Sequence, residues 1–122
     1  MKSVLIIVAG MFICSAFTPG SAVRQKNPLA ESIARGKEVY TNFCMSCHQD
    51  KGQGLEGSFP PLAKADYLVK FPEKAIHAVK YGQEGKIKVN GVEYDNMMPN
   101  PGLEPAQVAD VMNYIRNSWG NT

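Results

Sequence analysis

Hydrophobic residues repeat with helical spacing in three stretches of the chain. They recur at intervals of three and four over Glu31–Phe43, Pro72 to about Tyr81, and Pro105 to about Trp119. This period places side chains on one face of a helix. A proline at the first position favours the start of the second and third helices, and Gly82 and Gly120 predict their ends. The pattern therefore predicts a mostly α-helical protein.

The second and third predicted helices each have an apolar stripe that we expect to face the core. The stripes contain Ala75, Ile76 and Val79 in the second helix, and Val108, Val111, Met112, Ile115 and Trp119 in the third.

The segments between these helices favour loops and one short hairpin. Glycines and prolines are too dense in residues 52–61 for a regular element. Polar and apolar residues alternate over Lys86–Val89 and Val92–Tyr94, around Asn90-Gly91. This dipeptide is the signal of a type I′ hairpin, with arms short enough to form only a loop. Residues 95–102 contain two prolines and are predicted to be irregular.

The first residues are typical of an export signal. A lysine follows Met1, residues 4–17 carry no charge, and small residues occupy positions 20–22. The uncharged run is too short to span a bilayer comfortably. We predict a signal peptide over 1–22, a polar leader over 23–30 and one domain over 31–122. A lipid anchor on Cys14 is the disfavoured alternative, because Phe12-Ile13 are not the small residues it requires.

The net charge excludes one class of function, and the size of the domain indicates how it must be stabilised. The chain has 13 basic and 11 acidic residues and a net charge of +2, not the dense basic face of a nucleic-acid-binding protein. A domain of about 100 residues buries only about two thirds of its unfolded surface. We therefore expect a further source of stability.

The pentad Cys44-Met45-Ser46-Cys47-His48 has the C-x-x-C-H spacing that attaches haem c covalently. Two thiols three positions apart on a helical turn point the same way, toward the two vinyl groups of a porphyrin. The adjacent His48 can then bind the iron. A zinc site needs four ligands, whereas His77 is the only other histidine and is expected to be a surface residue. A thioredoxin-like pair needs a strand before Cys44, and none is predicted.

The second axial ligand of the iron is expected to be a methionine in the irregular segment. Met45 lies inside the attachment loop, and Met112 belongs to a core stripe. We favour Met98, with Met97 as the alternative, because the proline after Met98 favours an extended backbone there. A site with neither methionine bound, open at the sixth position, is the remaining possibility.

Further motifs occur in a consistent order along the chain. They are Gly36 and Tyr40 before the pentad, then Phe59-Pro60-Pro61-Leu62, Gly91-x-x-Tyr94, Met98-Pro99 and residues 114–121. With the pentad they resemble class I bacterial cytochrome c over Glu31–Asn121. The resemblance implies the small cytochrome c fold, with three to four helices around one covalent haem and a short hairpin-like loop.

The resemblance also implies roles for individual residues. The first and last helices would cross at Gly36, with Tyr40 packed against Val111 and Tyr114. A proline carbonyl, of Pro60 or alternatively Pro61, would accept a hydrogen bond from His48 Nδ1. The haem pocket would include Leu62, Leu68 and Tyr94.

These observations predict a periplasmic carrier of single electrons rather than an enzyme, with haem c and its iron as cofactor. Its partners would be redox proteins, bound transiently, with no nucleic acid and no small-molecule substrate. Contact with the membrane would come only through partner complexes or an uncleaved signal. Two alternatives are a haem enzyme or gas or peroxide sensor with an open sixth position, and a dedicated haem subunit of a larger oxidoreductase.

Overall fold

The computed structural model describes residues 27–121. The predicted signal peptide and the first half of the leader, residues 23–26, lie outside this range. The elements in chain order are α1 (Pro28–Phe43), α2 (Met45–His48), α3 (Asp66–Lys70), α4 (Pro72–Tyr81), β1 (Ile87–Val89), β2 (Val92–Tyr94) and α5 (Pro105–Arg116). The part of the chain described is therefore mostly α, as predicted.

Helix α1 begins at Pro28, three residues before the predicted start. The side chain of Asn27 accepts hydrogen bonds from the backbone N–H groups of Leu29 and Ala30 at 3.1 and 3.3 Å. These bonds satisfy two donors that a helix start leaves unpaired, and proline suits the first position because it lacks an N–H. Three residues assigned to the leader therefore belong to the helix.

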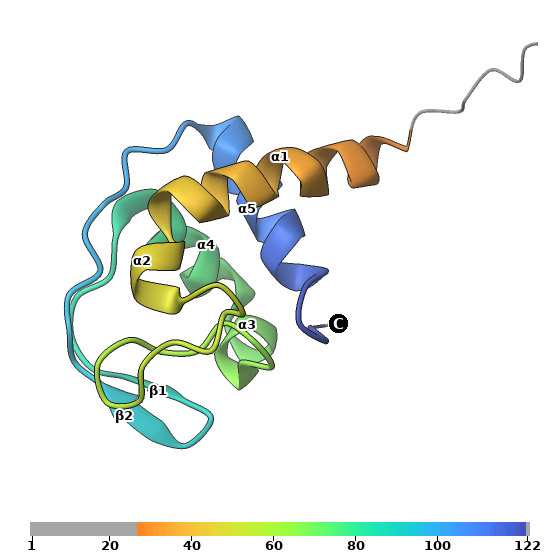
Figure 1. Ribbon diagram of the computed structural model, residues 1–122. Helices are drawn as coiled ribbons and strands as arrows, with labels where there is room; N and C mark the ends of the chain where they lie inside the picture. Colours follow the sequence, from red (N-terminus) through yellow and green to blue (C-terminus); the bar gives the residue numbers. More distant parts are fainter. Residues whose placement is uncertain (1–26, 122) are drawn as a thin grey trace, which may run out of the picture.

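Helices α1 and α5 cross and pack directly against each other (Figure 1). A Cβ added at Gly36 would collide with the backbone carbonyl of Asp110 and lie 2.8 Å from the Tyr114 Cβ. Beside this contact, the rings of Tyr40 and Tyr114 have centroids 5.4 Å apart, and Trp119 contacts both rings. The predicted packing of Tyr40 against Tyr114 is confirmed.

A network of hydrogen bonds between polar side chains also links α1 to α5 beside this crossing. Asp110 is 8 % exposed and accepts hydrogen bonds from Ser32 Oγ at 2.6 Å and from Arg35 Nε at 2.7 Å. Asn113 donates in turn to Ser32 Oγ at 2.9 Å. The carboxylate thus joins residues about one helical turn apart on α1 to a position on α5.

Asp110→Asn is expected to destabilise the domain in a pH-dependent way. The hydrogen bond from Arg35 is the main cause that lowers the pKa of Asp110 below its usual 3.8. A carboxyl with a lowered folded-state pKa stabilises the fold above its unfolded pKa, and this contribution is lost as the pH falls through the folded value. We expect a loss of about 1–3 kcal/mol at neutral pH.

Urea unfolding of wild type and Asp110→Asn at pH 7 and below pH 3 measures this effect. The difference between them should shrink in acid, and the exposed Glu38→Gln on α1 serves as the control. A difference that is the same at both pH values would contradict this role of the carboxylate.

The second half of the chain follows the predicted order, with three corrections. Helix α3 was not predicted, and Ile76 is 42 % exposed although it was placed in the core. Helix α5 ends at Arg116, three residues earlier than predicted, because the chain turns and Trp119 adopts a positive φ of 53°. The hairpin is confirmed, with positive φ at both Asn90 and Gly91, as a type I′ turn requires.

Candidate functional site

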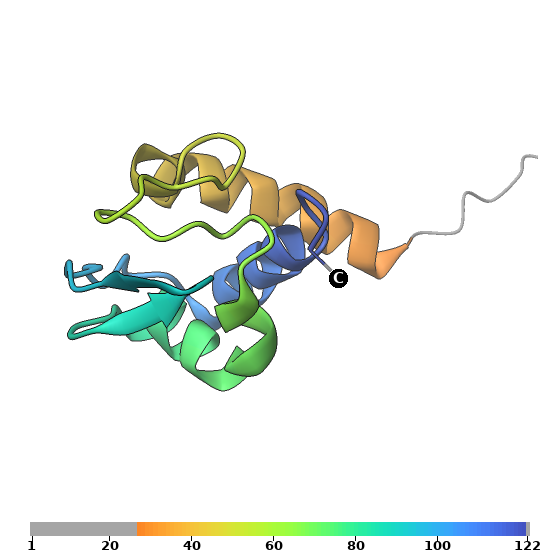
Figure 2. The ribbon, with the colours of Figure 1, turned by 90° about the horizontal axis from the view of Figure 1, so that it is seen from below.

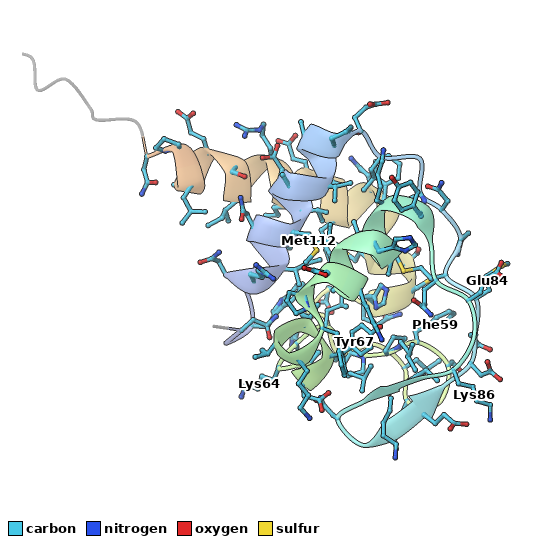
Figure 3. The ribbon with its side chains drawn as sticks, turned by 180° about the vertical axis from the view of Figure 1, so that it is seen from behind. Phe59, Lys64, Tyr67, Glu84, Lys86 and Met112 are labelled. Carbon is cyan, nitrogen blue, oxygen red and sulfur yellow. The ribbon has the colours of Figure 1, made fainter. Side chains whose placement is uncertain are left out.

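A large cavity lies between the loop of residues 49–64 on one side and the hairpin with α3 and α4 on the other, the two layers seen in Figure 2. It comprises about 1000 Å³, including its open mouth. Phe59, Tyr67 and Met112, labelled in Figure 3, reach it from the loop, α3 and α5. Among the described residues that line it there is no Asp, Glu, Lys or Arg.

Cys44 and Cys47 lie together on one wall of the cavity. Cys44 ends α1, and α2 is the single helical turn that follows and carries Cys47 and His48. Both thiols are free. Burial, and secondarily the neighbouring Cys47, raises the pKa of Cys44 to about 11, so its thiol is uncharged at neutral pH.

His48 is 7 % exposed and lines the same wall. Its Nδ1 lies 2.9 Å from the carbonyl oxygen of Pro60. A carbonyl can only accept, so Nδ1 carries the proton and donates, which leaves Nε2 with a free lone pair in the neutral ring. Burial lowers the pKa of His48 and favours that neutral form, partly opposed by the bond to Pro60. The carbonyl is that of Pro60, the favoured choice, and not that of Pro61.

Two glycines shape the loop that carries Pro60. The N–H of Gly54 donates to the His48 carbonyl at 3.0 Å, and Gly52 accepts from the N–H of Leu62 at 2.7 Å. Gly54 has a φ of +63°, and a Cβ there would collide with the Phe59 carbonyl. Only glycine combines that conformation with so close an approach. The sequence marked these glycines as loop residues but did not indicate that they hold the histidine's partner.

Met97 and Met98 lie on the cavity wall contributed by residues 94–99. Met97 is 63 % exposed, whereas Met98 is half-buried. The backbone of Met98 pairs with Gln83 through two hydrogen bonds, an interaction that the sequence did not predict. Tyr94, at the end of β2, is 5 % exposed and also lines the cavity.

More residues line the cavity than the sequence analysis predicted. Leu62 and Leu68 line the cavity, as the resemblance implied. Further apolar side chains come from α4 and the hairpin: Ala75, Ala78, Val79, Ile87 and Val89. A helical or strand period identifies an inward face, but it does not distinguish a face on the core from a face on a cavity.

The donor set and the lining fit a haem. Two thiols, one imidazole nitrogen and a thioether border a cavity whose other walls are mostly apolar and carry no charged side chain. A flat aromatic macrocycle needs such walls, and an iron with histidine and methionine ligands needs this pair of donors. Fold and site together therefore define a small mostly-α protein that holds a covalent haem.

The chain belongs to the cytochrome c family: the sequence model of that family, "Cytochrome c", matches residues 33–119. Cytochrome c-552 of Thermus thermophilus is 39% identical over 98 residues, which are 76% of this chain and 66% of that protein. Members of the family bind haem c covalently through cysteines spaced as Cys44 and Cys47 are, and the chain is an electron-transfer protein of this kind.

Two further relatives are parts of larger assemblies. The cytochrome c subunit of the quinone alcohol dehydrogenase of Gluconacetobacter polyoxogenes is 34% identical over 90 residues, which cover 70% of this chain and 19% of that subunit. The gluconate 2-dehydrogenase cytochrome c subunit of Pantoea cypripedii is 33% identical over 112 residues, 88% of this chain and 25% of that subunit. The chain thus matches a minor part of each of these two proteins.

The second histidine of the chain lies away from the cavity. His77 is exposed on α4, and its ring contacts that of Tyr81 at 4.8 Å between centroids. Across residues 27–121, no three His, Cys, Asp or Glu side chains cluster as a metal-binding group would. Within the same range, no helix is long and apolar enough to cross a membrane.

Proposed function

We propose that the protein is a periplasmic carrier of single electrons with one haem attached to Cys44 and Cys47. In this proposal His48 and Met98 are the two axial ligands of the iron. The haem supplies the redox chemistry, because its iron alternates between the ferrous and ferric states. The chain supplies the covalent attachment, the ligands and an apolar environment.

The observation that carries this proposal is the hydrogen bond between His48 Nδ1 and the Pro60 carbonyl, inside a cavity that is also bordered by Met98. The bond orients the ring and leaves Nε2 as the ligand atom, and a donor on Nδ1 also makes Nε2 more basic. The half-buried position of Met98 supports it over Met97, whose side chain is 63 % exposed.

The lining also supports electron transfer over peroxide or gas chemistry. Peroxidase-type catalysis needs an acid–base pair on the distal side, such as histidine beside arginine. His48 is the only histidine among the described lining residues, which include no arginine. His77 lies on the exposed side of α4, outside this lining.

The proposed location and partners rest on the sequence and the relatives. The uncharged segment over residues 4–17, followed by small residues, supports export from the cytoplasm. Two relatives are named as cytochrome c subunits of dehydrogenases, and another as a subunit of a cbb3-type cytochrome c oxidase. We propose that this protein exchanges electrons with enzymes of these two classes through small, transient contacts.

Met98→Ala tests the proposed ligand. We expect the oxidised wild-type holoprotein to show the low-spin spectrum and the sulfur-to-iron charge-transfer band of a histidine–methionine haem. Met98→Ala should lose this band and Met97→Ala should keep it, with covalent haem retained in both. The measurement is visible absorption of the oxidised and reduced proteins.

If only Met97→Ala lost the band, Met97 and not Met98 would be the axial ligand. A high-spin wild type would contradict methionine ligation and support an open site.

A further inference from the structure

The backbone of Met98 is tied to the end of α4. The N–H of Gln83 donates to the Met98 carbonyl at 2.9 Å, and the N–H of Met98 donates to the Gln83 carbonyl at 2.8 Å. The two residues form an isolated antiparallel bridge outside the hairpin. A reciprocal pair of bonds fixes both the distance and the direction of one backbone relative to the other.

Gly82 allows this close approach. Its φ of +90° and ψ of 175° lie in a region that is essentially restricted to glycine. A Cβ at Gly82 would lie 2.7 Å from the Met98 carbonyl oxygen and 2.9 Å from the Asn100 nitrogen. Both are backbone atoms, so they cannot move aside by a change of rotamer. Any side chain at this position would displace the segment that carries Met98.

A third contact holds the far end of the same segment. Lys80 Nζ, in the last turn of α4, donates to the Leu103 carbonyl at 2.5 Å. Leu103 itself is 1 % exposed. Hydrogen bonds therefore hold both Met98 and Leu103, the two ends of this segment, against the C-terminal end of α4.

We propose that Gly82 and Gln83 are positioning residues that hold the Met98 side chain at the iron against exchange for external ligands. This inference rests on the proposed ligation by Met98. An external ligand binds only the fraction of molecules in which the methionine has left, so its apparent affinity rises in proportion to that fraction. Loosening the bridge should therefore make external ligands bind more tightly.

Titration of the oxidised holoprotein with imidazole tests this proposal in Gly82→Ala and Gly85→Ala. The two glycines share a positive φ, +90° and +79°, but a Cβ at Gly85 would meet nothing within 4 Å. Gly82→Ala should bind imidazole at least about tenfold more tightly than wild type, a change of about 1.4 kcal/mol. Gly85→Ala should stay within about twofold of wild type. Equal affinities in the two variants would overturn the proposal.

A second pair of variants isolates the hydrogen bond, since a displaced backbone at Gly82 can also unfold the domain. Gln83→Pro removes the N–H donated to Met98, whereas Gln83→Ala keeps it and removes a side chain that donates to the Glu84 carbonyl and lines the cavity. Only the proline variant should bind imidazole more tightly, and unchanged binding in it would overturn the proposal.

Met98→Ala separates the two proposals. If it binds imidazole no more tightly than wild type, ligation by Met98 itself fails. If it binds more tightly while the Gly82 and Gln83 variants do not, only the positioning role fails.

Discussion

Gly36→Val is expected to destabilise the domain by about 3 kcal/mol or more, a large fraction of the roughly 5–15 kcal/mol by which a folded domain is normally stable. Alanine or valine in place of glycine normally improves a helix by up to about 1 kcal/mol. Here the new Cβ would collide with the backbone carbonyl of Asp110 and press on Tyr114. Because a helix backbone cannot yield locally, α1 and α5 would have to separate along their length.

Thermal and urea unfolding of the holoprotein measure this effect, with Gly36→Ala as the milder variant. Ala34→Val is the matched control, because position 34 is exposed on the same helix. A valine there has the same low helix propensity of a β-branched side chain but meets no neighbouring helix. Gly36→Ala should already fall well below Ala34→Val in stability. A Gly36→Ala protein more stable than wild type would show that the crossing can open at little cost.

His48→Ala should abolish the low-spin spectrum, whereas His77→Ala should leave it unchanged. The reason is that His48 is buried at the cavity wall and held by Pro60, while His77 is exposed on α4. In the proposed site, removing the His48 ring takes away one of the two axial ligands of the iron and leaves the Pro60 carbonyl without its donor. We expect at least about a tenfold lower yield of protein with a low-spin covalent haem.

Visible absorption, together with haem staining of the denatured protein on a gel, measures both ligation and covalent attachment. A normal low-spin spectrum in His48→Ala would show that another side chain is the proximal ligand. A changed spectrum in His77→Ala would point to that residue instead.

The helices that position the site could be predicted from periodicity, but the start of α1 and the end of α5 could not. Asn27 and Pro28 are typical of a helix start, but they lie among polar residues that were interpreted as a leader. Helix α3 has five residues, too few to show a period. Ile76 has the spacing of a core residue but is 42 % exposed, because the side of α4 that carries it is not covered. Short elements and exposed apolar residues depend on tertiary packing, which periodicity does not report.

The site could be predicted where chemistry is concentrated in adjacent residues. The pentad gives two thiols and an imidazole in five consecutive positions, and the resemblance to class I cytochrome c implied a proline carbonyl as the partner of His48. The bridge between Gln83 and Met98 could not be predicted, because backbone hydrogen bonds between distant loops leave no mark on side-chain pattern. The hydrogen bond that the Asn96 side chain donates to the Ser58 carbonyl at 3.0 Å could not be predicted either, because the sequence does not show which distant loop an asparagine will face.

The pairing of α1 with α5 has a consequence for how the chain folds during and after synthesis. Arg35 and Asp110 are 75 positions apart, so α1 leaves the ribosome well before its partner α5 has been made. Until then the face of α1 with Gly36, Val39 and Tyr40 has no partner, and an apolar helix face alone is only marginally stable in water. Contacts of such long sequence separation form late, because loop closure must be completed first. The nascent chain is thus expected to stay unfolded until α5 is made, the state in which a polypeptide can be threaded through a narrow translocation pore.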